Sequence, residues 1–296
     1  MGAFIKRFGL MIVMNLLVMV TISIILSVFN VQPYLSAAGI NYTSLMIYCL
    51  LWGFMGSIFS LFLSKFMAKK SMGVQIIDPN APQSGDQQWL LQTVHRLAQH
   101  AGLPKMPEVG IYDSPEMNAF ATGPSKSNSL VAVSTGIFSK MNKAELEGVL
   151  AHEVAHIANG DMVTMVMVQG VVNAFGMFLS RIIGHFLSTL VEEKNAHVVR
   201  MISTLVLDIV FNVLGMFVIS YFSRQREFRA DAGSASYSGK DKMIAALQKL
   251  QHEMLPPPSE KSPLATLQIS NRKAGFMNLL STHPSLEDRI ARLQGR

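Results

Sequence analysis

The segment 142–160 reads NKAELEGVLAHEVAHIANG, and its pattern predicts a single helix. Asn142 is a favourable N-cap residue, and Glu145 stands three positions later, where it completes a capping box. Asn159 and Gly160 favour a stop, because glycine readily adopts the left-handed conformation that ends many helices. We therefore expect a helix that begins after Asn142 and ends near Gly160.

Two histidines with a glutamate between them lie on this predicted helix. His152 and His156 are four residues apart, which on an α-helix offsets them by about 40° and separates them by about 6 Å along the axis. Both rings therefore project from one face and can bind one metal ion, with Glu153 beside it. These five residues alone are only moderately specific, because a histidine pair on a helix can also simply cap or pack.

A third ligand has to come from elsewhere in the chain, since a hydrolytic zinc site uses three protein ligands and leaves one position for water. Glu227 is the best candidate, in the run REFRAD at residues 226–231. Asp231 follows it by one helical turn and could orient a ligand histidine through a hydrogen bond. Taken alone, this run is better explained as a solvated, charged helix at the exit from a membrane.

The composition divides the chain between membrane and water. Of its 296 residues, 50% are hydrophobic and 15% are charged, which is too apolar for an ordinary soluble enzyme. Phe8 to Phe29 and Ser44 to Leu63 contain no charged residue, and each is long enough to cross a bilayer. They predict an N-terminal transmembrane hairpin. A cleaved signal peptide explains the first stretch less well, because that stretch is long and lacks an obvious cleavage site.

Two further apolar segments, Met162 to Ser180 and Met201 to Phe222, predict a second hairpin. Asp208 is costly inside the second segment, because an ionisable group at that depth usually faces protein or a water-filled cavity. We favour a structural role in which Asp208 and Asn212 meet Asn173 across the hairpin. A place for Asp208 in a substrate path is the alternative.

Basic residues border the first predicted hairpin on both sides: Lys6, Arg7, Lys65, Lys69 and Lys70. The positive-inside rule therefore predicts that both ends of the hairpin lie in the cytoplasm. Contact of such residues with anionic lipid explains the net charge of +6 more simply than a nucleic-acid partner does. The only cysteine, Cys49, lies in a predicted span, so the sequence offers neither a disulfide framework nor a thiolate metal site.

The remaining segments predict a small mixed α/β region and two C-terminal helices. In chain order they are a linker at 77–85, a helix around 89–98, strands at 109–112, 119–121 and 130–133, a helix at 242–253 and a last helix opened by 282–285. One edge of the sheet could hold an extended peptide by strand addition. The sequence contains no phosphate-loop motif, so we expect no use of ATP.

We therefore expect an α+β, mainly helical fold in four regions. These are an N-terminal transmembrane hairpin at 1–70, a cytosolic catalytic region at 71–161, a second transmembrane hairpin at 162–222, and a cytosolic catalytic region with the third ligand at 223–296.

Taken together, the motifs resemble the HtpX family of bacterial membrane zinc endopeptidases, which are related to the CAAX prenyl-protein endopeptidases of eukaryotic membranes. The resemblance covers nearly the whole chain, and the motifs that carry it are the two hairpins, MNAFATG at 117–123, HEVAH at 152–156, Glu227-x-x-x-Asp231, and Thr282-His283-Pro284 followed by Arg289. It implies a gluzincin-like zinc metalloprotease domain with a small sheet, combined with two transmembrane hairpins.

The resemblance also implies the site residues. One Zn²⁺ per chain would be bound by His152, His156 and Glu227, with Glu153 as the general base and Asp231 behind the ligands. A zinc ion can lower the pKa of water to about 7 and polarise a scissile carbonyl.

The related endopeptidases imply two more residues, Asn118 and His283, and the HtpX family pattern implies a third, Arg289. Asn118 and His283 would lie beside the reacting carbonyl as transition-state partners, and Arg289 would support the ligands. Each has a simpler alternative: Asn118 could shape the turn before a strand, His283 could stand at a helix entrance, and Arg289 could form a surface ion pair.

The implied function is ATP-independent hydrolysis of misfolded or damaged membrane proteins in the bacterial inner membrane, as part of quality control under stress. The catalytic region would face the cytoplasm, and the partners would be polypeptides and the lipid bilayer, without nucleic acid; nothing indicates an oligomeric state. The alternatives are a CAAX-type prenyl-protein endopeptidase, an intramembrane zinc protease and a catalytically silent membrane scaffold. The four predicted spans and the short chain argue against the prenyl-protein endopeptidase. The charges at Lys143, Glu145 and Glu147, just before the histidines, argue against the intramembrane protease, and the complete ligand set argues against the scaffold.

Overall fold

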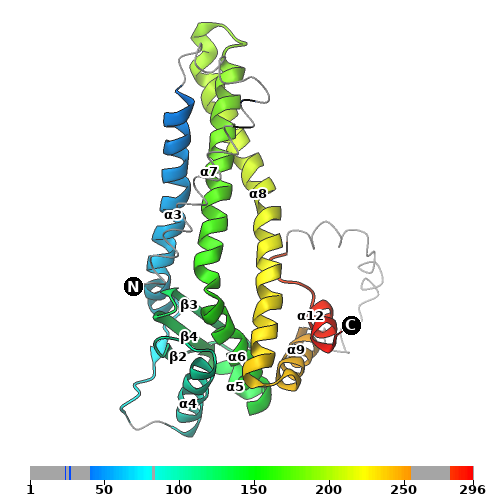
Figure 1. Ribbon diagram of the computed structural model, residues 1–296. Coiled ribbons are helices and arrows are strands. Elements are labelled where there is room, and N and C mark those ends of the chain that lie inside the picture. Colours follow the sequence, from blue (N-terminus) through cyan, green and yellow to red (C-terminus); the bar gives the residue numbers. More distant parts are fainter. Residues whose placement is uncertain (1–23, 25–26, 28–40, 82–83, 255–280, 296) are drawn as a thin grey trace. The chain divides into compact units, whose positions relative to one another are not determined.

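The structure is a computed structural model that describes residues 24, 27, 41–81, 84–254 and 281–295 (Figure 1). The first predicted span, Phe8 to Phe29, lies almost wholly outside the described residues. Contacts divide the chain into two compact units. We call Met1–Ser60 with Met165–Ile219 the apolar unit, and Leu61–Thr164 with Ser220–Arg296 the sheet unit.

The sheet unit contains a four-stranded sheet in the order β1-β2-β4-β3. Its strands are β1 (Gln75–Ile76), β2 (Glu108–Tyr112), β3 (Ala119–Ser125) and β4 (Asn128–Ser134). β2 and β4 are parallel, whereas the two outer pairs are antiparallel. The three predicted strands are confirmed, and the short β1 was not predicted. Gly123 has a φ of 138°, and a Cβ there would collide with the carbonyl of Asn128, so this position requires glycine.

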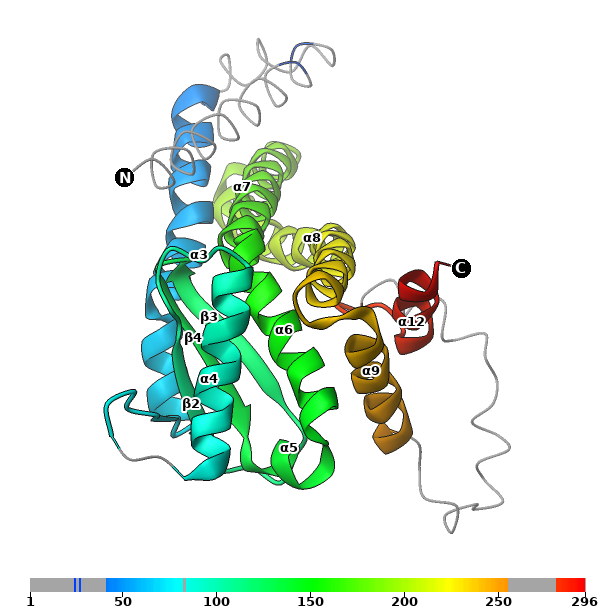
Figure 2. The same cartoon turned by 60° about the horizontal axis from the view of Figure 1, so that its bottom comes forward.

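Two helices, α4 (Gly85–His100) and α6 (Lys143–Asn159), cover one face of the sheet (Figure 2). The core between them is apolar and includes Leu90, Val94, Leu97, Val131, Val133, Leu146, Leu150 and Val154, each at most 2% exposed. Leu130 and Ala132 point to the other face of the sheet. There they belong to a second, smaller apolar cluster, against which Ala68 near the end of α3 (Tyr42–Ser71) packs. Successive strand residues alternate between faces, so the unbroken apolar run of β4 reflects burial on both sides.

The helix α6 begins and ends where the sequence predicts. Asn142 Oδ1 accepts hydrogen bonds from the backbone N–H groups of Ala144 and Glu145, at 2.9 and 3.0 Å, and Glu145 accepts one from the Asn142 N–H at 2.9 Å. Gly160 follows with a φ of 74° and closes the last turn. A short helix, α5 (Thr135–Lys140), precedes it and was not predicted.

A buried carboxylate ties α6 to its neighbours. Glu147 is 8% exposed and forms ion pairs with Arg96 of α4 at 3.0 Å and with Lys242 of α9 (Lys240–Met254) at 2.8 Å. Burial opposes ionisation of Glu147, but its hydrogen bonds to Lys242 and Arg96 outweigh that effect and hold its pKa below the ordinary value. Glu147 thus stabilises the packing of three helices while it is ionised.

The apolar unit is built from long helices. α3, α7 (Asp161–Ser188) and α8 (Glu193–Ser238) are each long and apolar enough to cross a membrane. α7 and α8 contain the segments predicted for the second hairpin. The sequence did not predict that α8 continues unbroken past Phe222, so that one helix carries both an apolar stretch and Glu227.

α3 and α7 pack through small residues. A Cβ at Gly53 would lie 2.6 Å from the backbone nitrogen of Ala174, and a Cβ at Gly170 would meet the Phe54 ring. Glycine at these positions lets the two helices approach closely, as is common between helices in membranes.

The expected contact of Asp208 and Asn212 with Asn173 is wrong. Asp208 Oδ1 instead lies 3.8 Å from Nη1 of Arg181, while Asn173 accepts a hydrogen bond from Gln169 at 2.9 Å and donates one to the Gly53 carbonyl at 3.5 Å. Asp208, Asn212 and Asn173 all line one cavity of about 310 Å³, but they are not hydrogen-bonded to one another. The long guanidinium of Arg181 reaches the carboxylate and compensates its charge, which an amide cannot do.

We predict that Gly53→Ala lowers the thermal unfolding temperature of the detergent-solubilised protein. The new methyl group would overlap Ala174, and overpacking typically costs about 1–3 kcal/mol. Gly56→Ala is the matched control, because no described atom lies within 4 Å of a Cβ there. It should be neutral or stabilising by up to about 1 kcal/mol. Equal unfolding temperatures for the two variants would contradict this account of the packing.

A second prediction concerns pH. Glu147→Gln should destabilise the protein by about 1–2 kcal/mol at pH 7, because two charge-assisted hydrogen bonds are weakened. A carboxyl group with a lowered pKa in the folded state stabilises the protein above its unfolded pKa, and that contribution is lost as pH falls through the folded pKa. The difference between the two proteins should therefore shrink below about pH 4.3. Chemical unfolding in detergent at several pH values measures it, and a difference that persists undiminished in acid would exclude the charge as its cause.

Candidate metal centre

Two helices bring the three candidate ligands together. α6 supplies His152 and His156, and α8 supplies Glu227. The helices approach closely because Gly233 of α8 faces Ala155, where a Cβ on the glycine would lie 2.7 Å from the alanine Cβ. Ala155 is next to His156, and Gly233 lies less than two turns from Glu227, so the close approach sets how far apart the ligands lie.

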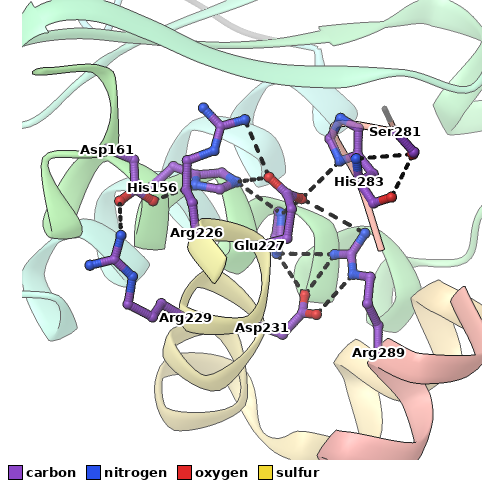
Figure 3. Close-up of polar contacts among 10 residues, drawn as sticks. His156, Asp161, Arg226, Glu227, Arg229, Asp231, Ser281, His283 and Arg289 are labelled. Carbon is purple, nitrogen blue, oxygen red and sulfur yellow. Dashed lines mark hydrogen bonds and ion pairs between the residues drawn. The ribbon is translucent and has the colours of Figure 1, made fainter. Parts of the chain in front are cut away.

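The donor atoms of the three side chains converge, and Figure 3 shows the His156 ring directed at the Glu227 carboxylate. The two histidine Nε2 atoms are 3.1 Å apart. Each also lies 3.4 Å from one carboxylate oxygen of Glu227, His152 from Oε2 and His156 from Oε1. His152 and Glu227 are buried and His156 is half-buried, so the group is largely shielded from water.

Each histidine ring is held from behind by a carboxylate. His152 Nδ1 lies 2.9 Å from Oδ1 of Asp231, and His156 Nδ1 lies 2.7 Å from Oδ2 of Asp161. A carboxylate accepts a hydrogen bond from Nδ1–H, which leaves Nε2 with a free lone pair directed at the other ligands. Asp231 was singled out in the sequence, whereas Asp161 was missed. Its only signal was an acidic residue directly after the glycine stop of α6.

Arg289 is buried, not part of a surface ion pair. It comes from α12 (Leu286–Gln294) and is 7% exposed. Its Nε and Nη2 donate hydrogen bonds to the two oxygens of Asp231, at 2.8 and 2.6 Å. Burial opposes ionisation of Asp231, but Arg289 and His152 outweigh it and keep its pKa below the usual range. Arg289 therefore holds the carboxylate that orients His152.

His283 also reaches the cluster. Its Nδ1 lies 3.1 Å from Glu227 Oε2, and its side chain is 60% exposed (Figure 3). The segment that carries it is fixed by a hydrogen bond of 2.9 Å from Arg224 to the carbonyl of Ser281. The ring thus touches a candidate ligand on one side and faces solvent on the other.

Glu153 and Asn118 are not held by the cluster. Glu153 is half-buried, and within the described ranges no hydrogen bond or ion pair restrains its carboxylate. Asn118 is exposed and directly precedes the edge strand β3, where its backbone exchanges hydrogen bonds with Ser134. The structure does not bring the Asn118 side chain into contact with the three candidate ligands.

The electrostatics of the group favour a cation at its centre. Burial raises the pKa of Glu227, but hydrogen bonds to His152 and His283 lower it far more, so the carboxylate is ionised. Burial also lowers the pKa of His152, yet Asp231 and Glu227 raise it to about 9.

Glu227 Oε1 is buried and accepts no hydrogen bond from any described residue, although Nη2 of Arg226 lies 3.4 Å away. Both histidine Nδ1 atoms are hydrogen-bonded to carboxylates. The two Nε2 atoms and the Glu227 carboxylate therefore direct their lone pairs at one another across 3.1 to 3.4 Å. Such an arrangement is unfavourable unless a proton or a metal ion lies between the donors. The residues present therefore fit a metal ion.

A histidine pair on a helix, a facing glutamate and apolar helices of membrane-spanning length together define a membrane metalloprotease. The comparisons with known proteins agree. Residues 84–296 match the family described as Peptidase family M48, and the chain belongs to this family.

Its curated relatives are named as HtpX proteases, which confirms the resemblance seen in the sequence. Protease HtpX of Acinetobacter baylyi is 48% identical, over 97% of this chain and 98% of that protein. The Protease HtpX homolog of Bacillus subtilis is 49% identical, over 98% of this chain and 99% of that protein.

A solved structure confirms the fold class. The crystal structure of S. mikatae Ste24p superposes with a TM-score of 0.59 at 17% sequence identity, covering 96% of this chain and 66% of that chain. At this identity the likeness concerns the fold alone. It agrees with the mainly helical metalloprotease fold with a small mixed sheet that the sequence predicts.

Proposed function

We propose that this membrane metalloprotease is a zinc endopeptidase in which His152, His156 and Glu227 bind one Zn²⁺. The observation that carries the proposal is the spacing of the donor atoms, 3.1 to 3.4 Å. Zinc binds nitrogen and oxygen ligands at about 2.0–2.1 Å, and a tetrahedral arrangement then separates neighbouring donors by about 3.3 Å. Two imidazoles and one carboxylate are also a typical ligand set of catalytic zinc, whereas magnesium and calcium favour oxygen ligands alone.

The residues around the ligands have separate tasks in this mechanism. A bound zinc ion would supply Lewis-acid chemistry, because it polarises a carbonyl and makes water easier to deprotonate. Glu153 has a carboxylate that is free to accept a proton from the attacking water and to donate it to the leaving amine. Asp231 and Arg289 keep the His152 ring in its orientation.

Asn118 and His283 are proposed as partners of the reacting carbonyl. His283 already contacts Glu227 and exposes 60% of its side chain, so its ring can donate a hydrogen bond toward a bound peptide. Asn118 stands at the start of β3, which is the last strand of the sheet order β1-β2-β4-β3. An extended substrate that adds to this edge as a further strand would pass the Asn118 side chain.

The proposed substrates are misfolded or damaged membrane proteins, and their hydrolysis would need no ATP. Two features support this choice. Glu227 follows Phe222, the end of the apolar stretch, by five residues within the unbroken helix α8. The ligand therefore lies only about 7–8 Å along the helix axis from that stretch. The relatives in Acinetobacter baylyi and Bacillus subtilis are named as HtpX proteases.

We also propose that the protein crosses the bacterial inner membrane several times with the sheet unit in the cytoplasm, because Lys65, Lys69 and Lys70 follow the apolar part of α3. In a Cys49→Ser background, Ser84→Cys should resist an impermeant thiol reagent applied to intact spheroplasts. Asn195→Cys, near the turn between α7 and α8, should react. Labelling at position 84 with protection at position 195 would reverse the proposed orientation.

A paired substitution tests the catalytic proposal. Glu153→Gln should keep about one zinc per chain yet lose casein cleavage by at least about 100-fold, because an amide cannot relay the proton. Glu227→Ala should lose zinc itself, since it removes an anionic ligand. The measurements are elemental analysis and peptidase assay of the purified proteins, with Glu116→Gln in an exposed loop as the control. Full zinc occupancy and normal turnover in Glu227→Ala would remove Glu227 from the ligand set.

A further inference from the structure

The His156 ring has a carboxylate partner that the catalytic proposal does not use. Asp161 is 1% exposed, and its Oδ2 lies 2.7 Å from His156 Nδ1. Its other oxygen lies 3.5 Å from Nη2 of Arg229 (Figure 3). A carboxylate so deeply buried needs polar partners, and the His156 ring is the nearer of these two.

The chain geometry explains how Asp161 reaches this position. α6 ends at Asn159, so His156 lies in the last turn of its helix. Gly160 then takes the left-handed conformation, with a φ of 74°, and interrupts the helix. Asp161 begins α7 directly after this interruption, and its carboxylate lies behind the His156 ring. A helical spacing rule would not find this pair, because the two residues belong to different helices.

The two histidines are therefore held by similar but unequal arrangements. Behind His152, Asp231 accepts two hydrogen bonds from Arg289, which is buried. Behind His156, Asp161 has one long contact with Arg229, whose side chain is 57% exposed. The contact is long and the Arg229 side chain is mostly in water, so the orientation of His156 should depend on Asp161 itself and hardly on Arg229.

We propose that Asp161 is a positioning residue of the metal centre, which fixes the Nδ1–H tautomer and the ring orientation of His156 so that Nε2 is presented to the metal. This inference rests on the proposed zinc site. Asp161 touches neither substrate nor metal, and it acts only through His156. Loss of such a partner typically weakens metal binding by about 10–100-fold.

The test measures metal affinity in the purified full-length protein by competition with a chelator, together with the visible absorption of bound Co²⁺, which reports ligand geometry. Asp161→Ala should weaken Zn²⁺ binding by about 10–100-fold and alter the Co²⁺ spectrum. Asp161→Asn keeps a helix-start residue and a hydrogen-bond acceptor but loses the charge. We expect it to fold normally and to bind zinc with intermediate affinity. Arg229→Gln should change the affinity by less than about 3-fold.

Two controls separate the possible outcomes. Asp86→Ala removes an exposed acidic residue from the first turn of α4 and should leave affinity and spectrum unchanged. His156→Ala should abolish tight binding; unchanged affinity there would overturn the proposed zinc site itself. If His156→Ala loses zinc but folded Asp161→Ala keeps wild-type affinity and spectrum, only the role of Asp161 is overturned. Should Asp161→Ala fail to fold, wild-type affinity in Asp161→Asn decides against the proposal in the same way.

Discussion

The close approach of α6 and α8 is the constraint on which the metal centre depends. Gly233 against Ala155 and the hydrogen bond of 2.9 Å from Ser234 to the Gly148 carbonyl hold the two helices at short range. Gly148 in turn leaves room for the backbone of Lys242 in α9, so α9 can pack on α6. Small residues at these crossings let rigid helices set the donor spacing, and a rigid scaffold is what a metal site of defined geometry requires.

The ligand helix could be predicted closely because its signals are local. Asn142, Glu145 and Gly160 fix the two ends of α6, and the spacing of His152 and His156 fixes their common face. Glu227 and Asp231 could be named from one short motif, although only the structure shows Asp231 between His152 and Arg289. The strands β2, β3 and β4 were found for a similar reason, since their apolar runs are short and bounded by polar turns.

The features that the sequence did not predict have one physical cause in common: they depend on tertiary contacts. Asp161 meets His156 across the break between α6 and α7 at Gly160, and Arg181 replaces Asn173 as the partner of Asp208 because a longer side chain reaches farther. The two exposed residues of β1 carry no apolar pattern at all. The charged run at 226–231 was expected on a helix, but the apolar segment was expected to end at Phe222, and the local pattern does not show that the two form one unbroken helix.

The chain order of the two ligand helices has a consequence for biogenesis. α7 and the apolar part of α8 are synthesised between the histidines of α6 and Glu227, and Arg289 comes later still. A nascent chain that has emerged only as far as α7 therefore carries at most two of the three proposed ligands. The complete donor set exists only once the apolar stretch of α8 has left the ribosome, so the order of synthesis itself delays a competent metal centre until the segments destined for the bilayer have been made.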